Sequence, residues 1–545
     1  MISHLLVLSR RAGPGLVVLA VLACTDEKIV FREPVNPPPD ANSGFLGYFT
    51  ATDRQTTCGN CHIGHQRAWL NTAHAEAYAT LANNPGAQDF CYSCHTVSNK
   101  GNATSAPAGW EAIEDAAYHD VQCESCHGPG NDHVQEPDAP ASANNPPLAH
   151  VAVLGDSATL ARSCADCHSG FHQPFVEEWS ASAHAVSLQE EDGTFVNDVS
   201  PSCGSCHEGR NALAAWGVTS DYAERNLPGT ENYLGITCAV CHDPHGFKRG
   251  SDGQPVAGQL RYPIDVADVN QNLCMKCHQR RAEPDQASSR GPHAPQGPML
   301  LGDAGYKPAG FDPDVQAVAS THGSERNPRL CAGCHVNSYT VNDPNTGDLV
   351  FQSVGHLFLP IPCLDPQGVP TNNRTCAYDT PSRTWAACTN SGCHADASTA
   401  AAAFNLSSQR LDQLTSQIWD DLNGNDSLEA SPTDAGYLSN FTLIPATEYE
   451  TGDNRVSPAE GALFNVRMLR PGSRHVGGGL DGSSGVHNPF LAEALLRADI
   501  DELQATYPGL PPAAPAVQEI LKGPLGAVTK RPLSRPLISR PITSR

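Results

Sequence analysis

Residues 121–133 read VQCESCHGPGNDH, and within them Cys123, Cys126 and His127 form the pattern CxxCH. Two thiols at this spacing reach both vinyl groups of one haem, and the histidine that follows places its imidazole under the iron. The stretch therefore predicts a covalently attached haem with the surrounding chain folded against it.

The same pattern occurs eight times along the chain, and a ninth site, CTNSGCH at residues 388–394, has a longer loop between its cysteines. Zinc is the alternative for paired cysteines, but a zinc ribbon takes two pairs per metal and needs no histidine directly after each pair. We therefore expect nine covalent haems. The attachment cysteines and axial histidines are Cys58, Cys61 and His62; Cys91, Cys94 and His95; Cys123, Cys126 and His127; Cys164, Cys167 and His168; Cys203, Cys206 and His207; Cys238, Cys241 and His242; Cys274, Cys277 and His278; Cys331, Cys334 and His335; and Cys388, Cys393 and His394.

Each low-spin haem needs a second axial ligand, called the distal ligand, and histidine is the residue in supply. Only four methionines occur, and Met299 and Met468 are the two outside the N-terminal signal and the motifs. Thirteen non-motif histidines remain beyond His4. We expect nine of them to be distal ligands: His74, His119, His133, His184, His245, His293, His322, His356 and His487. For His65, His150, His172 and His475, a surface or hydrogen-bonded role is the prediction.

Local context supports this ranking. His74 and His184 each follow a tryptophan by five residues, in AWLNTAH and EWSASAH, on segments with a helical pattern. Four others lie beside glycine or proline, where a loop can fold over a haem face. His487 precedes Asn488 and Pro489, a typical N-cap and first helical residue.

Composition predicts a mainly α fold with long loops and little regular secondary structure. Only 39% of the 545 residues are hydrophobic, and glycine and proline number 47 and 44, so side chains alone supply a thin core. The first cysteines of successive motifs lie 33, 32, 41, 39, 35, 36, 57 and 57 residues apart. This loose repeat predicts stacked haem-binding units organised around the covalent haems.

Two further features lie outside the motifs. Cys363 and Cys376 remain after the haem cysteines are assigned, and in an exported protein they favour a disulfide over two free thiols. Asp421, Asn423 and Asn425 alternate as oxygen ligands do in a calcium loop, but Pro432 stands where such a loop has glutamate. Calcium binding and a surface turn rich in Asp and Asn both stay open.

A resemblance enters at residues 55–190, where Cys58, Trp69, His74, CYSCH and CESCHGPG with a nearby histidine resemble the tetrahaem cytochrome family that accepts electrons from hydroxylamine oxidation. The later stretches ITCAVCHDPHG, RGPHAPQGPM and GVHNPF are similar to large multihaem respiratory cytochromes. The resemblance implies electron transfer outside the cytoplasm with mainly bis-histidine haems, although the family includes members with one open haem.

The expected organisation follows from these patterns. Residues 1–23 are a signal peptide of lipoprotein type with Cys24 as the lipid anchor, or an ordinary signal peptide. The remaining regions are a proline-rich tether at 24–45, a tetrahaem cytochrome-like region at 46–200, a five-haem region at 201–400, a helical region at 401–510 and a basic disordered tail at 511–545. Within the helical region, residues 407–420 predict an amphipathic helix with Leu411, Leu414 and Ile418 on one face.

The functional prediction is an electron carrier of anaerobic or extracellular respiration without catalytic residues. It would be periplasmic or an outer-membrane or cell-surface lipoprotein, with redox partners such as other cytochromes, a quinol-oxidising complex or an outer-membrane conduit. The alternatives are a multihaem reductase of nitrite, hydroxylamine or a sulfur oxyanion, and a haem filament subunit. A net charge of -24 without a recognition motif argues against nucleic acid.

Overall fold

The computed structural model describes residues 36–102, 104–138, 164–170, 173–185, 201–218, 235–246, 257–287, 290–311, 322–343, 345–373, 375–390, 393–450, 453–470, 483 and 485–525. The signal peptide, Cys24, His150, His172, His475 and residues 526–545 lie outside this set.

Short helices joined by long loops make up the motif-bearing part of the chain. This confirms a mainly α fold with little regular structure, while its organisation around haems stays a prediction. The α-helices here are α2 Ile63–Trp69, α3 Ala77–Ala82, α4 Tyr92–His95, α5 Trp110–Ile113, α6 Cys123–His127, α7 Asn131–Gln135, α8 Phe175–Ala181, α9 Pro201–His207, α10 Gly209–Ala215, α11 Cys238–Cys241, α12 Gln296–Leu301, α13 Cys331–His335 and α14 Ala386–Thr389.

Single turns of 3₁₀-helix alternate with these helices. They are η1 Ala51–Asp53, η2 Cys58–Asn60, η3 Ala73–Glu76, η4 Asp89–Cys91, η5 Ala116–Tyr118, η6 Cys164–Asp166, η7 Ala183–Ala185, η8 Ala257–Gln259, η9 Cys274–Lys276 and η10 Ala446–Tyr449.

The sheets are small antiparallel pairs. They are β1 Tyr48–Thr50 with β2 Gln55–Thr56, β3 Tyr339–Asn342 with β4 Leu349–Ser353, β5 Cys363–Leu364 with β6 Pro370–Thr371, and β7 Asp420–Asp421 with β8 Asp434–Ala435. In the longest pair Tyr339 lies opposite Ser353.

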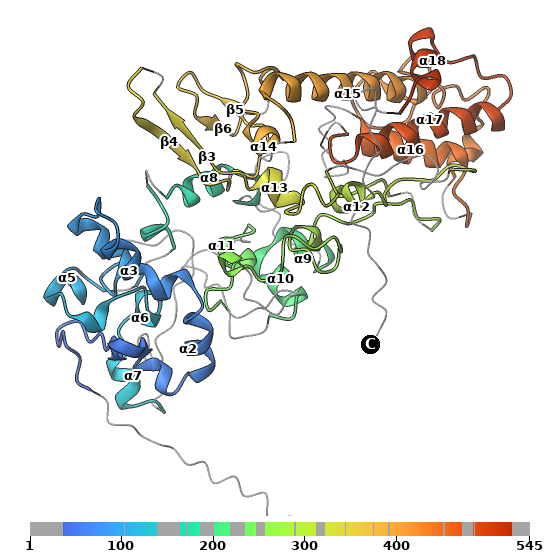
Figure 1. Cartoon of the computed structure of the whole chain (residues 1–545). Helices are drawn as coiled ribbons and strands as arrows, with labels where there is room; N and C mark the ends of the chain where they lie inside the picture. The colour runs from blue at the N-terminus through green and yellow to red at the C-terminus, as the bar shows by residue number, and fades with distance from the viewer. Residues whose placement is uncertain are drawn as a thin grey trace, which may run out of the picture.

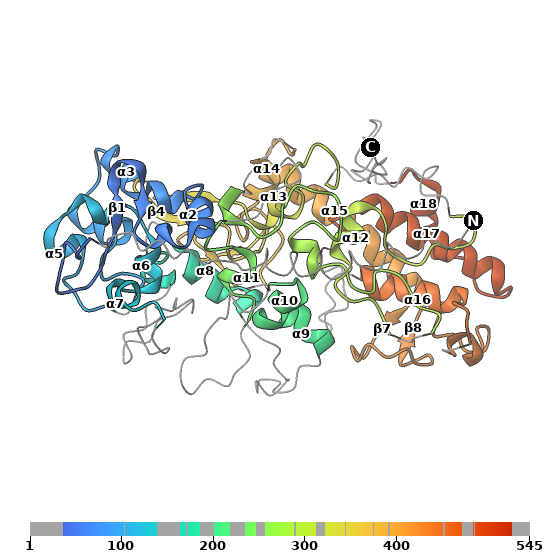
Figure 2. The same ribbon diagram turned by 90° about the horizontal axis from the view of Figure 1, so that it is seen from below.

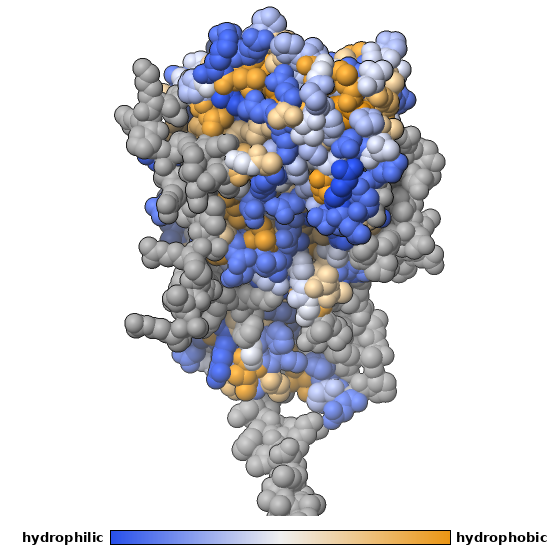
Figure 3. Space-filling model, turned by 90° about the vertical axis from the view of Figure 1, so that its right-hand side faces the viewer, coloured by the Kyte–Doolittle hydropathy of each residue, from blue (hydrophilic) through white to orange (hydrophobic). Residues whose placement is uncertain are grey.

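The molecule is elongated, and Figures 1 and 2 agree on its long axis. Helices α2 to α7 form one end, and the helices that follow the last motif form the other. These are α15 Ala397–Ile418, α16 Pro458–Leu469, α17 Pro489–Thr506 and α18 Pro515–Lys522. From the side shown in Figure 3, hydrophilic residues cover most of the described surface and hydrophobic ones form small separate groups.

The predicted helix at 407–420 is confirmed within α15, which begins earlier, at Ala397. Leu411, Leu414 and Ile418 are all buried, as the pattern predicted. They join residues of α16, α17 and α18 in the largest hydrophobic cluster of the described chain. This end of the molecule therefore has a conventional side-chain core.

The N-cap prediction for α17 is also confirmed, because Asn488 Oδ1 accepts a hydrogen bond of 3.0 Å from Leu491 N and Pro489 is the first helical residue. Asparagine satisfies a backbone N–H that the helix itself leaves unpaired. The cap fixes where α17 starts and so fixes the position of His487 in front of it.

At the ends of the described chain, one expectation of disorder is corrected, and the described part of the expected tether is packed. Residues 515–522, assigned to the basic tail, form α18, which buries Val517 and Ile520 against the C-terminal core. A proline in the first turn and apolar residues on one face explain why this helix forms. The overall composition of the tail did not indicate it. In the segment assigned to the tether, Phe45 is fully buried against Tyr118, and Asp40 is buried as well.

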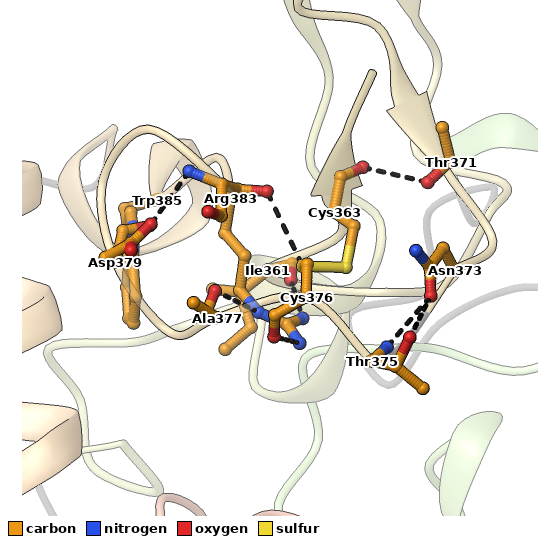
Figure 4. The surroundings of a disulfide bond; sticks show 11 residues. Ile361, Cys363, Thr371, Asn373, Thr375, Cys376, Ala377, Asp379, Arg383 and Trp385 are labelled. Carbon is orange, nitrogen blue, oxygen red and sulfur yellow. Dashed lines mark hydrogen bonds between the residues drawn. A yellow bond between two sulfur atoms is a disulfide. The ribbon is translucent and has the colours of Figure 1, made fainter. Parts of the chain in front are cut away.

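The disulfide prediction is confirmed by a bond between Cys363 and Cys376 (Figure 4). The guanidinium of Arg383 organises the same loop, because it donates to the carbonyl oxygens of Ile361 at 2.8 Å and Cys376 at 3.0 Å. It also stacks over the ring of Tyr378 at 3.9 Å. This insertion between the eighth and ninth motifs is thus held by one covalent link and one arginine.

The candidate calcium loop closes through its own hydrogen bonds. Asp421 Oδ1 accepts from Gly424 N at 2.7 Å, Oδ2 accepts from Asp426 N at 2.8 Å, and Arg470 lies 3.5 Å from the same carboxylate. Among the described residues no three His, Cys, Asp or Glu side chains are grouped to hold a metal ion. The hydrogen bonds are those of a turn rich in Asp and Asn, and calcium binding stays a prediction.

Candidate haem-binding site

One large cavity runs through the motif-bearing part of the molecule. Its volume is about 4140 Å³, and its lining includes every cysteine and histidine of the nine motifs. Protein interiors are close-packed, with few voids larger than a water molecule. A space of this size, lined in this way, is suited to bound groups rather than to a side-chain core.

The motif cysteines are available for attachment. All eighteen lie within the described residues, and none of them forms a disulfide. They reach the cavity from short helical turns such as η2 and α6, where the following histidine stays close to the first cysteine. For example, His62 N donates to Cys58 O at 2.9 Å and His127 ends α6. Each motif therefore presents two thiols and one imidazole to the cavity together.

Across the cavity, motif histidines lie ring to ring with histidines from distant parts of the chain. Seven such pairs occur within the described residues. Their centroid distances are 6.4 Å for His62 with His133, 6.0 Å for His168 with His74, 6.3 Å for His127 with His245, 6.2 Å for His278 with His184, 6.0 Å for His207 with His293, 6.2 Å for His242 with His356 and 6.2 Å for His335 with His487.

These distances fit a metal between the two rings. A histidine nitrogen binds a metal at about 2 Å, and the ring centre lies about 1 Å further out, so two imidazoles on opposite sides of one iron have centroids about 6 Å apart. The cysteines of the same motif line the same cavity. The residues present therefore fit haem, which is held by two thioethers and two axial imidazoles.

Two of the expected distal histidines are placed differently. His322 lies within electrostatic range of His394 of the ninth motif, with its Nδ1 2.6 Å from Val486 O. His119 stacks on Tyr78 with centroids 3.5 Å apart. For His95 of the second motif, the described residues include no opposing histidine ring; its Nδ1 lies 2.9 Å from Ala77 O.

His65, which was expected to have a surface or hydrogen-bonded role, contacts the rings of two of the paired histidines. Its centroid lies 6.1 Å from His62 and 4.6 Å from His245. His62 stands three residues before it on the same turn, so His65 does not oppose a motif histidine across the cavity. Its surroundings agree with a packing role beside the pair of His127 and His245.

Burial keeps the proposed distal imidazoles neutral. Loss of solvent lowers the pKa of His74, His184, His245 and His356 to about 4 in each case. A neutral imidazole has a nitrogen lone pair to offer a metal at neutral pH, whereas a protonated one does not. The cavity therefore supplies imidazoles in the protonation state that ligation needs.

Backbone carbonyls orient several motif histidines. His242 Nδ1 lies 2.6 Å from Gly258 O, and His335 Nδ1 lies 2.9 Å from Phe358 O. A hydrogen bond at Nδ1 fixes the tautomer that leaves Nε2 for a metal and holds the ring in place. The second nitrogen of each ring is thus directed toward the cavity.

Sequence reasoning missed one residue that holds a distal candidate. Glu178, a buried residue of α8, accepts hydrogen bonds from Val354 N at 3.0 Å and His356 N at 2.6 Å. Glu178 and His356 are far apart in sequence, so no local pattern could reveal their contact. The glutamate fixes the turn that aims His356 at His242.

The motifs form a continuous succession in space. Thiols of different motifs lie close enough to shift each other's pKa in four cases: Cys58 with Cys123, Cys94 with Cys167, Cys206 with Cys277 and Cys274 with Cys331. Weaker electrostatic contacts join Cys126 to Cys164, Cys241 to Cys274, Cys334 to Cys393 and His168 to His242. The order is first, third, fourth, sixth, seventh, eighth and ninth motif, with the second beside the fourth and the fifth beside the seventh.

No helix among the described residues is both long enough and hydrophobic enough to span a lipid bilayer.

Comparison with known proteins agrees with this geometry. The family described as cytochrome c554 and c-prime matches residues 57–128. A multiheme cytochrome MtrA from Shewanella baltica is 25% identical over 292 residues, which cover 49% of this chain and 74% of the relative. Cytochrome c-554 from Nitrosomonas europaea is 29% identical over 139 residues, 21% of this chain and 56% of the relative. No solved structure matches.

The nine motifs, the cavity that they line and these relatives lead to one conclusion. The chain is a multihaem c-type cytochrome that resembles the cytochrome c554 family, and its general function is electron transfer.

Proposed function

We propose that the protein carries electrons through nine covalently attached haems, most of them with two histidine ligands. The seven opposed histidine pairs, at 6.0–6.4 Å, carry this proposal. Haem, when bound, supplies a one-electron iron couple whose potential depends on axial ligands and burial. The chain's residues attach it, orient the imidazoles and keep water out.

Ligation from both sides favours a carrier over an enzyme. An imidazole on each face of the iron leaves no coordination position for a substrate. The succession of neighbouring motifs from Cys58 to Cys393 supports a path along the length of the molecule. The histidines thus provide fixed, neutral ligands and perform no proton chemistry.

The cellular setting is part of the same proposal. Covalent haem attachment and a disulfide fit an exported protein. The segment ending at Cys24 supports a lipid anchor, with the protein in the periplasm or at the cell surface. The proposal includes anaerobic or extracellular respiration, with other cytochromes, a quinol-oxidising complex or an outer-membrane conduit as partners, and similarity to a multiheme cytochrome supports redox partners in general.

A reductase is the second candidate, and one observation favours it. The seven ring pairs within the described residues involve neither His95 nor His394, so an iron with an exchangeable position would lie at the second or the ninth motif. Such a site would bind nitrite or hydroxylamine directly. The two candidates therefore differ at one motif.

Electron paramagnetic resonance of the oxidised protein, with haem counted by intact mass, tests the proposal. We expect nine haem additions, and we expect His487→Ala to convert one haem from low to high spin. His65→Ala, which removes a histidine that opposes no motif histidine, is the matched control and should leave every haem low-spin. If the wild type has one high-spin haem that shifts on adding nitrite or hydroxylamine, the reductase replaces the carrier. Fewer than nine additions would lower the haem count.

A further inference from the structure

Two distant segments of the chain build the same local structure. Helix α2 ends at Trp69 and is followed by η3, and helix α8, which contains Trp179, is followed by η7. Trp69 Nε1 donates to Val121 O at 2.9 Å, and Trp179 Nε1 donates to Ile236 O at 2.8 Å. Each indole is therefore tied to a loop far along the chain.

The same loop residue also binds the histidine that follows each tryptophan. Val121 N donates to His74 O at 3.1 Å, and Ile236 N donates to His184 O at 2.7 Å. One backbone residue thus holds the indole with its carbonyl and the histidine with its N–H. We call each of these two sets a Trp–His clamp. The first clamp consists of Trp69, His74 and Val121, and the second consists of Trp179, His184 and Ile236.

The clamps occupy equivalent places among the motifs. Val121 stands two residues before Cys123 of the third motif, and Ile236 stands two residues before Cys238 of the sixth. The histidine rings leave the clamps toward the fourth and seventh motifs, with centroids 6.0 Å from His168 and 6.2 Å from His278. Moving along the chain by three motifs therefore reproduces the whole arrangement.

The backbone of five motifs follows the same period. The first, fourth and seventh motifs begin on 3₁₀-helices, η2, η6 and η9, whereas the third and sixth begin the α-helices α6 and α11. Histidines from later parts of the chain also lie opposite motif histidines of earlier sets. His127 of the third motif lies opposite His245, and His242 of the sixth lies opposite His356. Successive sets of three motifs thus exchange histidines both ways.

In the second clamp, the backbone at Gly235 lies very close to the backbone at His184 and Ala185. A Cβ atom added at Gly235 would lie 2.5 Å from His184 O and 2.6 Å from Ala185 O. Such contacts are with backbone, which cannot move aside without shifting the histidine. At the equivalent position of the first clamp, Asp120 has a positive φ of 69° and its carboxylate accepts from Tyr48 OH at 2.7 Å. In both clamps this residue directly precedes the backbone N–H that donates to the histidine carbonyl.

We propose that the chain is a repeat of three motifs in which the Trp–His clamp of one set positions the distal histidine for the first haem of the next set. Trp69 and Trp179 are then positioning residues for His74 and His184. The inference rests on the proposed bis-histidine ligation and adds to it the residues that orient two of the ligands. Orientation matters because hydrogen-bonded surroundings set how strongly an imidazole binds its metal.

Trp179→Phe removes the indole N–H and keeps an aromatic ring, so it tests the clamp directly. In the nine-haem protein we expect the low-spin resonance of one haem to shift or to convert partly to high spin, with the other eight unchanged. Gly235→Ala, which leaves the tryptophan and histidine side chains unchanged and acts through the backbone of His184, should perturb the same resonance. Trp69→Phe should perturb a different single haem, and it keeps the test available if the variants of the second clamp do not load haem.

Trp419→Phe is the matched control. Trp419 donates its indole N–H to Asp434 at 2.8 Å in the C-terminal core and does not line the cavity. This variant should lower stability without changing any haem resonance. The clamp is overturned if the Trp179, Gly235 and Trp69 variants leave the spectra unchanged, or if Trp419→Phe changes them in the same way.

His184→Ala separates this inference from the proposal beneath it. Full conversion of one haem to high spin, with silent tryptophan and glycine variants, overturns the clamp and leaves the ligation standing. No change in His184→Ala overturns the ligand assignment itself.

Discussion

The motif-bearing region and the C-terminal helical region solve the same problem of burial in different ways. Before the last motif, most buried apolar residues form small separate clusters such as Phe45, Val97, Ala108 and Tyr118. Met299 and Ala304 instead belong to the large cluster of the C-terminal region. After the last motif, α15 to α18 share one large cluster of buried side chains. The first region encloses a cavity of about 4140 Å³, whereas the second is packed.

The difference shows where each region obtains its folding free energy. Apolar area removed from water contributes roughly 25 cal/mol per Å², and the C-terminal region collects this contribution from its own leucines and aromatics. The motif-bearing region has too few such residues in any one place. Its interior must come from the group that fills the cavity, as in small metal-dependent folds.

Withholding haem should separate the two regions most sharply. In a chain exported without haem attachment, we expect residues 46–395 to lose their fold while residues 396–525 stay folded. Limited proteolysis followed by mass spectrometry should yield a resistant fragment from the C-terminal region alone. Equal digestion of both regions would show that the C-terminal core also depends on haem.

Leu414→Ala should destabilise the C-terminal region and leave the motif-bearing region unchanged. Leu414 is fully buried in the C-terminal core, and truncating a buried leucine costs about 2–5 kcal/mol. We expect this loss in thermal or denaturant unfolding of the C-terminal region, with haem spectra unchanged. Leu422→Ala, at a leucine that is 60% exposed, is the control. A comparable loss in the control would argue against core packing as the cause.

Removing the disulfide tests a region that has neither haem nor a large core. The bridge between Cys363 and Cys376 joins residues 13 apart in sequence, and closing a loop of this size contributes roughly 3 kcal/mol. Cys363→Ser with Cys376→Ser should lower the midpoint of unfolding accordingly. Thr375→Ala in the same loop should change the free energy of unfolding by less than about 0.5 kcal/mol. A drop in haem content in the double variant would instead link the insertion to its neighbouring motifs.

The smallest expected effect lies at the boundary between the two regions. Asn488 caps α17 and stands next to His487, and losing an asparagine cap costs about 1 kcal/mol. Asn488→Ala should lower stability by that amount, and Asn488→Asp should restore it because aspartate caps equally well. If the aspartate variant stays as unstable as the alanine variant, the cap is not the reason.

Local patterns were readable from the sequence, and contacts between distant segments were not. The N-cap at Asn488, the buried face of Leu411, Leu414 and Ile418, and the Cys363–Cys376 bond depend on neighbours in the chain. Glu178 and His356 lie 178 residues apart, so their contact has no sequence signal. Helix α18 was missed because the basic residues after it dominate the composition of that stretch.

The same limit applies to the histidines. Of the nine expected distal histidines, all but His119 line the cavity, and seven oppose a motif histidine. His65, which was not expected as a ligand, also lines the cavity. The partner of each of the seven could not be derived, because His184 passes over the two motifs after it to meet His278. His119 was expected as a ligand from its place beside the third motif; its ring is stacked on Tyr78, and its ligation stays a prediction.

The direction of histidine exchange also sets an order of events for a chain that is exported from its N-terminus. In the proposed pairing, the fourth and seventh motifs meet His74 and His184, which have already crossed the membrane when those motifs emerge. The third, sixth and eighth motifs must wait for His245, His356 and His487, which are translocated later. Some irons would therefore be closed on both faces at once, while others stay open on one face until a later stretch arrives, and the last of them closes only when the start of α17 has been delivered.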